Sequence, residues 1–294
     1  MDSLKDTLTG LAGNDIYVIN SAIDDIVEVA GEGTDDRMQA SVSFTLAADD
    51  DIEVMQTINA GFTTAINLTG NTLGQAIFGN AGDNILDGGL DSARDTLIGA
   101  GGNDTYVINS TADVIVEAAG GGAADRVQTS VTFTLVADDD IEIFETANAA
   151  GIIALNLTGN ALIQSVTGNA AGNTLNGALG NDTLTGLAGA DKFLFNTALD
   201  AANNHDTITD FSVVDDTIQL DDSIFAGLAA GALAANLFQD LALGAQDGAE
   251  VVIYNSATGD IFFDTNGAGT AGGLVLFADV SNGTALTNSD FVVV

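Results

Sequence analysis

The chain has 294 residues, enough for one large domain or two ordinary ones, and 46% of them are apolar, so it can bury a core. Its 42 Asp and Glu residues against five Lys and Arg give a formal net charge of −37, which makes nucleic acid and anionic membranes poor partners. Because cysteine is absent, a disulfide framework and any cysteine-ligated metal site are excluded.

The N-terminus carries no long apolar run. Met1 is followed by Asp2, Lys5 and Asp6, so we expect no Sec-type signal peptide. No segment of the sequence is long and apolar enough to cross a membrane, and we therefore expect no membrane insertion.

The sequence repeats itself over a long period. Residues 6–60 align without gaps to residues 95–149, and roughly two positions in three match, which marks duplicated units that bury their faces against neighbours. We take the two long repeats as 6–94 and 95–181. A third copy starts at Asp182 and then diverges.

A shorter period of nine residues is incomplete at the start of the first long repeat. Only a remnant at residues 6–8 and the unit GLAGNDIYV at 10–18 survive, so the chain is either the C-terminal piece of something longer or begins with a degenerate turn. The stretches 26–30, 41–46 and 51–58 alternate or are rich in β-branched residues, and they predict further, less regular solenoid strands.

The nine-residue units form two complete runs, beginning at Gly70 and Gly159. The clearest is GNAAGNTLN-GALGNDTLT-GLAGADKFL at 168–194, with Gly first, Asn or Asp sixth and a large apolar residue eighth. Six polar, Gly-rich residues predict a turn that can hold a metal, and three residues predict a short strand whose middle side chain enters a core. The fold class is therefore all-β, a parallel β-roll or β-solenoid.

The turns carry the oxygen ligands that calcium prefers. Calcium takes six to eight oxygens from carboxylates, carbonyls and water, and Gly allows backbone oxygens to point inward. In a β-roll successive turns alternate sides, so a site needs suitable sixth residues two units apart. The same-side pairs each join one amide to one carboxylate: Gln75 with Asp95, Asn84 with Asp104, Gln164 with Asp182, and Asn173 with Asp191.

Mixed pairs predict modest calcium affinity and about one site per run, at Asn84/Asp104 and Asn173/Asp191. The alternative is that the amides form a hydrogen-bond ladder that closes the turns without metal, and this alternative is favoured for Gln75 and Gln164. The complete set of candidate calcium ligands is Asp15, Asn84, Asp95, Asp104, Asn173, Asp182, Asp191, Asp206 and Asp210.

The last two candidates come from the segment 191–220, where strands KFLF and DTITDF flank a polar loop. Asp206 and Asp210 could close a calcium site at the end of the solenoid, or the segment could be a solvated hairpin. Residues 223–238 have the Ala and Leu content of one or two short helices. The final residues, 289–294, predict an edge strand that closes the domain.

Together these features resemble the C-terminal region of RTX, or haemolysin-type calcium-binding, proteins of bacterial type I secretion. The block from GADKFLFN to DDTIQL resembles the segment after the β-roll in serralysin-like proteins, and the terminal DFVVV resembles the uncleaved export signal of that group. The resemblance implies an RTX solenoid at 1–194 and a smaller β-rich secretion domain at 195–294. It also implies Ca²⁺ as ligand, a secreted protein, and the type I secretion machinery as a partner of the segment ending Asp290–Val294.

The expected function is a calcium-binding, non-enzymatic module that folds when calcium binds outside the cell. Two alternatives remain open: a structural or adhesive extracellular solenoid, and the non-catalytic tail of a secreted hydrolase. A β-helix enzyme that modifies polysaccharides would need basic or aromatic residues gathered on one face, and five scattered basic residues argue against it.

Overall fold

Nearly all regular structure in this chain is β-strand. The computed structural model describes residues 4–90, 92–244, 248, 250–267 and 273–294. These fall into two compact units, one made of Met1–Val131 with Asp138–Ile143 and the other of Thr132–Ala137 with Phe144–Val294. The predicted boundary between residues 194 and 195 stays a prediction.

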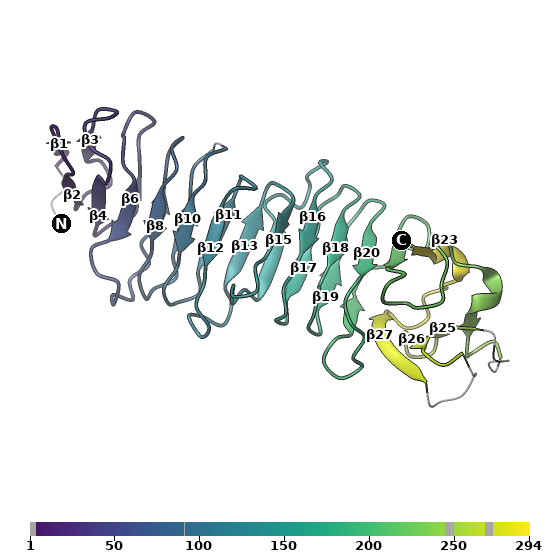
Figure 1. Ribbon diagram of the computed structural model, residues 1–294. Coiled ribbons are helices and arrows are strands. Elements are labelled where there is room, and N and C mark those ends of the chain that lie inside the picture. The colour runs from purple at the N-terminus through teal and green to yellow at the C-terminus, as the bar shows by residue number, and fades with distance from the viewer. Residues whose placement is uncertain (1–3, 91, 245–247, 249, 268–272) are drawn as a thin grey trace. The chain divides into compact units, whose positions relative to one another are not determined.

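The first unit is a stack of short parallel strands (Figure 1). They form a pair β1-β3, a sheet β12-β10-β8-β6-β4-β2 and a ladder β5-β7-β9-β11-β13. Neighbours in each sheet are two strands apart along the chain, which is the pattern of a solenoid. The strands are β1 (Thr7–Thr9), β2 (Ile16–Ile19), β3 (Asp25–Val27), β4 (Arg37–Ala40), β5 (Phe44–Thr45), β6 (Val54–Thr57), β7 (Leu68–Thr69), β8 (Ala76–Phe78), β9 (Ile85–Asp87), β10 (Thr96–Ile98), β11 (Thr105–Ile108), β12 (Val114–Val116) and β13 (Arg126–Thr129).

In the second unit the orders are β15-β17-β19-β21-β27-β26-β25-β24 and β14-β16-β18-β20-β22-β28-β23, and neighbours are two strands apart from β15 to β21 and from β14 to β22. Its strands are β14 (Phe133–Thr134), β15 (Ile143–Thr146), β16 (Asn156–Thr158), β17 (Ser165–Thr167), β18 (Thr174–Asn176), β19 (Thr183–Thr185), β20 (Lys192–Phe195), β21 (Asp206–Ile208), β22 (Thr217–Leu220), β23 (Gly231–Ala232), β24 (Phe238–Asp240), β25 (Val252–Asn255), β26 (Asp260–Asp264), β27 (Leu274–Val280) and β28 (Phe291–Val293). The prediction of an all-β fold with a parallel solenoid is confirmed.

The eighth residue of each nonapeptide forms the core. Leu175 and Leu184 are the middle residues of β18 and β19, and Phe193 lies within β20. All three are fully buried. Because parallel strands stack in register, equivalent side chains lie one above another, as Val166, Leu184 and Ile208 do. The three-residue strand with one buried side chain is thus the repeating unit of the core.

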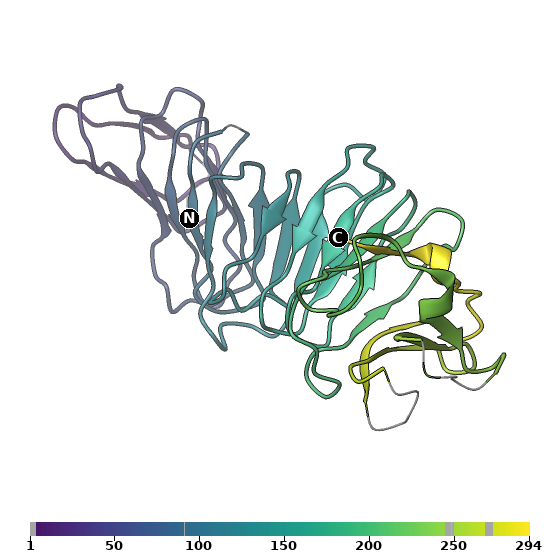
Figure 2. The ribbon, with the colours of Figure 1, turned by 45° about the vertical axis from the view of Figure 1, so that its right-hand side comes forward.

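The C-terminal segment of the second unit packs on the end of its stacked strands. Figure 2 shows this segment, which ends in yellow, beside the last green strands of the stack. Strands β25, β26 and β27 are antiparallel, and aromatic rings fill the space behind them. Phe277 makes edge-to-face contacts with Phe195 at 5.1 Å and with Phe225 at 5.0 Å.

Three sequence expectations for this segment need correction. KFLF and DTITDF contribute β20 and β21, which belong to different sheets with parallel neighbours, so the hairpin alternative is wrong. The helical structure in residues 223–238 is limited to a short 3₁₀ turn, η1 (Ala235–Leu237), because their many Gly and Ala residues bury too little surface to hold a longer helix, and the segment also contains the strand β23. The last strand is internal, since β28 lies between β22 and β23 after the turn η2 (Asn288–Asp290).

In the described part of the chain, no helix has the length and apolar character that crossing a bilayer requires.

Candidate metal centre

A ladder of hydrogen bonds joins the sixth residues of same-side turns. The residue directly before each strand donates its backbone N–H to the side chain of the equivalent residue two strands later. The backbone of Asn84 donates to Oδ1 of Asp104 at 2.7 Å, and that of Asn173 donates to Oδ1 of Asp191 at 2.7 Å. Gln75 does the same with Asp95, and Gln164 with Asp182. The structure therefore brings together all four pairs that the spacing predicts.

The amide-bearing turns close themselves without a metal. In the turn of Asn173, its Oδ1 accepts the N–H of Asn169 and its Nδ2 donates to Oδ1 of Asn169 at 3.2 Å. Asn84 repeats both contacts with Asn80, and Gln75 and Gln164 repeat them with the Asn four residues earlier. This is the hydrogen-bond ladder that the amides predict, so Asn84 and Asn173 as calcium ligands stay predictions.

The carboxylate-bearing turns have a different backbone. In the turns of Asp95, Asp104, Asp182 and Asp191 the second residue is not Asn and adopts a positive φ: Gly89 (104°), Ala100 (82°), Ala178 (73°) and Leu187 (72°). Leu11, in the turn of Asp15, does not. In the described turns of Asp104, Asp182 and Asp191, the second residue is Ala or Leu and has no polar side chain to pair with the sixth residue as Asn169 pairs with Asn173. The chain therefore contains two kinds of turn, distinguished by residues two and six together.

In the turns of Asp104, Asp182 and Asp191, Oδ1 of the sixth residue accepts the N–H of the preceding same-side turn. Oδ2 of Asp104, Asp182 and Asp191 is buried without a hydrogen-bond partner. Burial raises the pKa of each of these three carboxyls to about 7, and the backbone N–H on Oδ1 offsets only part of the shift. A charged form of such a carboxylate needs a positive partner.

Glycine at the first position makes room for these oxygens. A Cβ on Gly177 or Gly186 would overlap Oδ2 of Asp182 or Asp191. Gly168 occupies the first position of the preceding turn on the same side as Gly186. A Cβ on Gly168 would lie 2.9 Å from the carbonyl oxygen of Gly186. Carboxylate oxygens thus point into the space at Gly177 and Gly186, and a carbonyl oxygen approaches the space at Gly168; such hard oxygen donors fit calcium.

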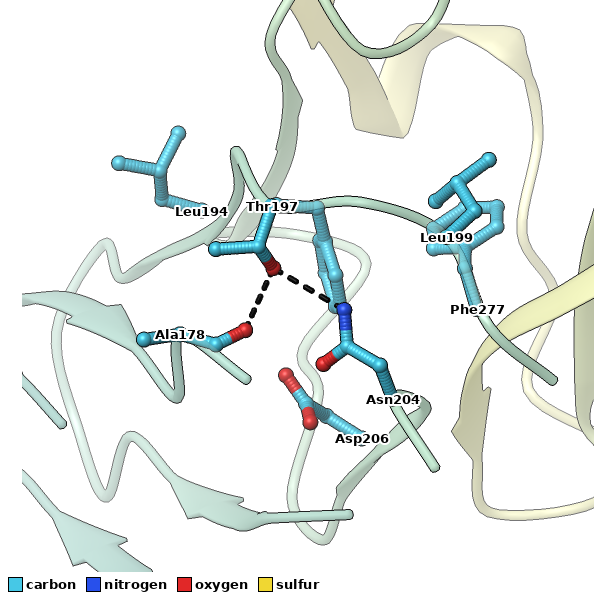
Figure 3. A pocket seen from close by; sticks show the side chains of 8 residues that line it. Ala178, Leu194, Thr197, Leu199, Asn204, Asp206 and Phe277 are labelled. Carbon is cyan, nitrogen blue, oxygen red and sulfur yellow. Dashed lines mark hydrogen bonds between the residues drawn. The ribbon is translucent and has the colours of Figure 1, made fainter. Parts of the chain in front are cut away.

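Asp206 extends the ladder past the last nonapeptide. It begins β21, and its Oδ1 accepts the N–H of Asp182 at 3.1 Å. Burial, followed by the negative charge of Asp182, raises the pKa of Asp206 to about 8. Figure 3 shows its carboxyl group pointing toward the hydroxyl of Thr197 and the amide of Asn204 in a small pocket.

Asp210 does not share a turn with Asp206. Its two oxygens accept the N–H groups of Gly186 at 2.9 Å and Leu187 at 2.8 Å, so it caps a loop on the other side of β21. The joint site of Asp206 and Asp210 that the sequence suggested is therefore not supported by any contact between their side chains among the described residues.

Two clusters of three acidic side chains contain residues that the nonapeptide pattern does not connect. Asp104 lies with Glu117 and Asp125, and Asp15 lies with Glu28 and Asp36; in each trio, one ligand atom per residue lies within 4.8 Å of the others. Sequence reasoning selected Asp15 and Asp104 and missed the other four. The signal that identifies them is the long repeat, because Asp15, Glu28 and Asp36 recur 89 positions later as Asp104, Glu117 and Asp125.

Comparison with known families identifies the repeat. A family profile described as the RTX calcium-binding nonapeptide repeat matches in four copies, over residues 4–18, 76–92, 91–115 and 167–196. Among curated proteins, no match is found. The matched segments include the nonapeptide candidates Asp15, Asn84, Asp95, Asp104, Asn173, Asp182 and Asp191, whereas Glu117 and Asp125 lie outside them.

Proposed function

We propose, from the premise that this chain is a β-solenoid carrying RTX calcium-binding repeats, that it is the calcium-binding module of a bacterial protein exported by type I secretion. The module folds when calcium binds outside the cell and has no catalytic role of its own. The five basic residues are scattered along the sequence, which supports a role in binding and folding.

The observation that carries the calcium part is the set of buried carboxylate oxygens without partners. Asp182 and Asp191 each use Oδ1 to tie two turns together, while Oδ2 points into the space left by a glycine. Each of these two carboxylates, on its own side of the solenoid, would contribute to a separate calcium site. Calcium would supply the positive charge that their ionised forms lack.

The same arrangement supports a folding switch. Without calcium at neutral pH, the turn carboxylates repel one another and a net charge of −37 opposes compaction. Extracellular calcium modules have Kd values of about 10⁻⁴ to 10⁻³ M, so such sites stay empty in calcium-poor cytosol and fill outside the cell. Because the ion binds only the folded turns, its binding free energy adds to the stability of the fold.

The C-terminal strand supports recognition of the chain before it folds. Phe291 and Val293 are buried in β28, which pairs with strands on both sides. A secretion receptor would therefore reach these side chains only in the unfolded chain. Export before calcium binding meets this requirement.

The folding switch is tested by far-ultraviolet circular dichroism of the full chain with a chelator and with millimolar calcium. We expect the β signal to appear cooperatively with calcium and not with magnesium, which demands a smaller octahedral site. The same β spectrum and the same urea midpoint in chelator and in calcium would overturn the switch.

Export is tested separately in a bacterium that expresses a type I secretion system. We expect the full chain to reach the medium and a chain ending at Ser289 to stay in the cells. Equal export of both chains would exclude a role for the terminal segment Asp290–Val294.

A further inference from the structure

The trio Asp104, Glu117 and Asp125 is assembled by the end of a nonapeptide run and the two irregular turns that follow it. Asp104 directly precedes β11 and Asp125 directly precedes β13, and these strands pair with Thr105 opposite Arg126. Glu117 directly follows β12, which lies in the other sheet. The parallel register therefore places two carboxylates side by side, and the turn after β12 brings the third to them.

The hydrogen bonds of the trio leave oxygens directed into it. The N–H of Asp104 donates to Oδ1 of Asp125 at 2.7 Å, and the N–H of Asn84 donates to Oδ1 of Asp104 at 2.7 Å. Oδ2 of Asp104 and Oδ2 of Asp125 are buried without a hydrogen-bond partner. Both aspartates are fully buried and Glu117 is 2% exposed, so water does not solvate their charges.

The space between these groups is lined by oxygen. A Cβ on Gly99 would overlap Oδ2 of Asp104 and the hydroxyl of Tyr106, and it would lie 2.8 Å from Oε2 of Glu117. The phenol of Tyr106 donates a hydrogen bond to Glu117 and fixes its orientation. Calcium–oxygen distances of about 2.3–2.6 Å require ligand atoms of one ion to lie within about 5 Å of each other, and 4.8 Å meets this limit.

We propose that the nonapeptide residue Asp104 binds one calcium ion together with Glu117 and Asp125, which lie outside the matched repeats, with Tyr106 as the residue that positions Glu117. The site lies at the end of a nonapeptide run, because the matched repeat ends at residue 115. The proposal shares with the proposed function only the identity of the ion.

The long repeat supports this reading. Asp15, Tyr17, Glu28 and Asp36 repeat the spacing, and Tyr17 again donates to Glu28. The divergent third copy has Asp191 at the position of Asp104 but Phe193 in place of Tyr106. Tyrosine and glutamate thus occur together in the two copies that form the trio.

Tyr106 makes the site visible to terbium, a luminescent ion that replaces calcium among oxygen ligands and is excited through a nearby phenol. The full chain carrying Tyr17→Phe is titrated with terbium while tyrosine is excited. The Tyr17→Phe change removes the phenol that would excite terbium at Asp15, Glu28 and Asp36. Adding Tyr106→Phe should abolish the emission that calcium displaces, and it should weaken calcium binding at the trio because the phenol no longer orients Glu117. Adding Glu117→Gln should raise the apparent Kd about 10- to 100-fold, a loss that even outer-shell partners of a metal produce.

Asp222→Asn, which removes one exposed carboxylate, is the matched control and should leave the titration unchanged. An unchanged titration in the Glu117→Gln chain, with calcium heat still present, would overturn the trio and leave the nonapeptide sites standing. Absence of calcium heat in every chain would instead overturn the proposed function. If Glu117→Gln does not fold in calcium, Glu117→Asp replaces it, because the shorter carboxylate withdraws the ligand and keeps its charge.

Discussion

The backbone N–H of Asn173 donates to Oδ1 of Asp191 at 2.7 Å, although the two residues are 18 positions apart in sequence. One carboxylate therefore fixes the spacing of two same-side turns with one oxygen and leaves the other for a cation. Asn173 belongs to an amide turn that closes itself, whereas Asp191 belongs to a turn that does not. Along each ladder the amide turn is followed by acidic positions, as Gln164 is followed by Asp182 and then by Asp206, so calcium dependence belongs to the positions after the amide turn.

Converting one turn type into the other should remove part of the calcium dependence. In Leu187→Asn/Asp191→Asn, the new pair can form the contacts that Asn169 and Asn173 make, and Asn tolerates the positive φ of position 187 better than Leu. We expect this chain to resist urea better than the natural chain in chelator and to bind calcium more weakly. Urea unfolding with and without calcium measures both effects.

Asp191→Asn alone is the informative control for that double variant. Its new Nδ2 group would face the Gly186 space without an Asn at position 187, and a buried donor left unpaired costs about 1–3 kcal/mol. A single variant as stable in chelator as the double variant would contradict the two-residue definition of the turns.

First-position glycine should be required for calcium binding. In Gly186→Ala the new methyl group would overlap Oδ2 of Asp191, so we expect loss of calcium affinity at that turn and a lower urea midpoint in calcium. Gly61→Ala is the matched control, because its Cβ would approach only Oδ1 of Asn59, at 3.4 Å. Calorimetry of both variants decides the matter; equal calcium binding would show that the glycine space holds no ion.

Much of this arrangement follows from the nine-residue period. The period predicts that Leu175, Leu184 and Phe193 are buried, and pairing turns two units apart predicts the contacts of Asp182 and Asp191. The period predicts nothing about Glu117, because that residue follows β12 in the other sheet and reaches Asp104 through the turn after β12.

The long repeat holds information that the short period lacks. In the long repeat, Glu28 and Asp36 correspond to Glu117 and Asp125, and both copies keep the same spacing between the two residues. A metal site present in both copies explains this pattern. Residue type alone was misleading at Asp210, whose carboxylate accepts two backbone N–H groups. Whether an Asp binds an ion or caps a loop depends on which N–H groups lie within its reach, and this is a property of the folded chain.

Two alanines, Ala171 and Ala178, stand where the repeat has glycine. Replacing each with glycine should change the stability of the fold in opposite directions. Ala178 has φ 73°, where an L-residue with a Cβ is strained by about 1–2 kcal/mol, so Ala178→Gly should stabilise the fold by about 1 kcal/mol. Ala171 lies in an amide turn and is not among the residues with positive φ, so Ala171→Gly should destabilise by about 0.5–1 kcal/mol through chain entropy. Urea unfolding in calcium measures both, and equal shifts would contradict the assignment of turn types.

The stability of the calcium-free protein should fall as the pH rises. The pKa values of Asp104, Asp182 and Asp191 are raised to about 7 and that of Asp206 to about 8, whereas unfolded Asp has a pKa of about 3.9. Between these values the folded chain binds more protons than the unfolded chain, so the free energy of unfolding decreases with pH. The contribution of these carboxyls is complete below their unfolded pKa and is lost as the pH rises through about 7 to 8.

Calcium should reverse this trend, since it binds the deprotonated carboxylates. We expect the urea midpoint in chelator to be higher at about pH 5 than at about pH 8, and the midpoint in millimolar calcium to be higher at about pH 8. Asp182→Asn should flatten the dependence in chelator, because its amide does not titrate, and Asp222→Asn should not. A calcium-free midpoint that rises with pH would mean that another cation already neutralises these buried groups.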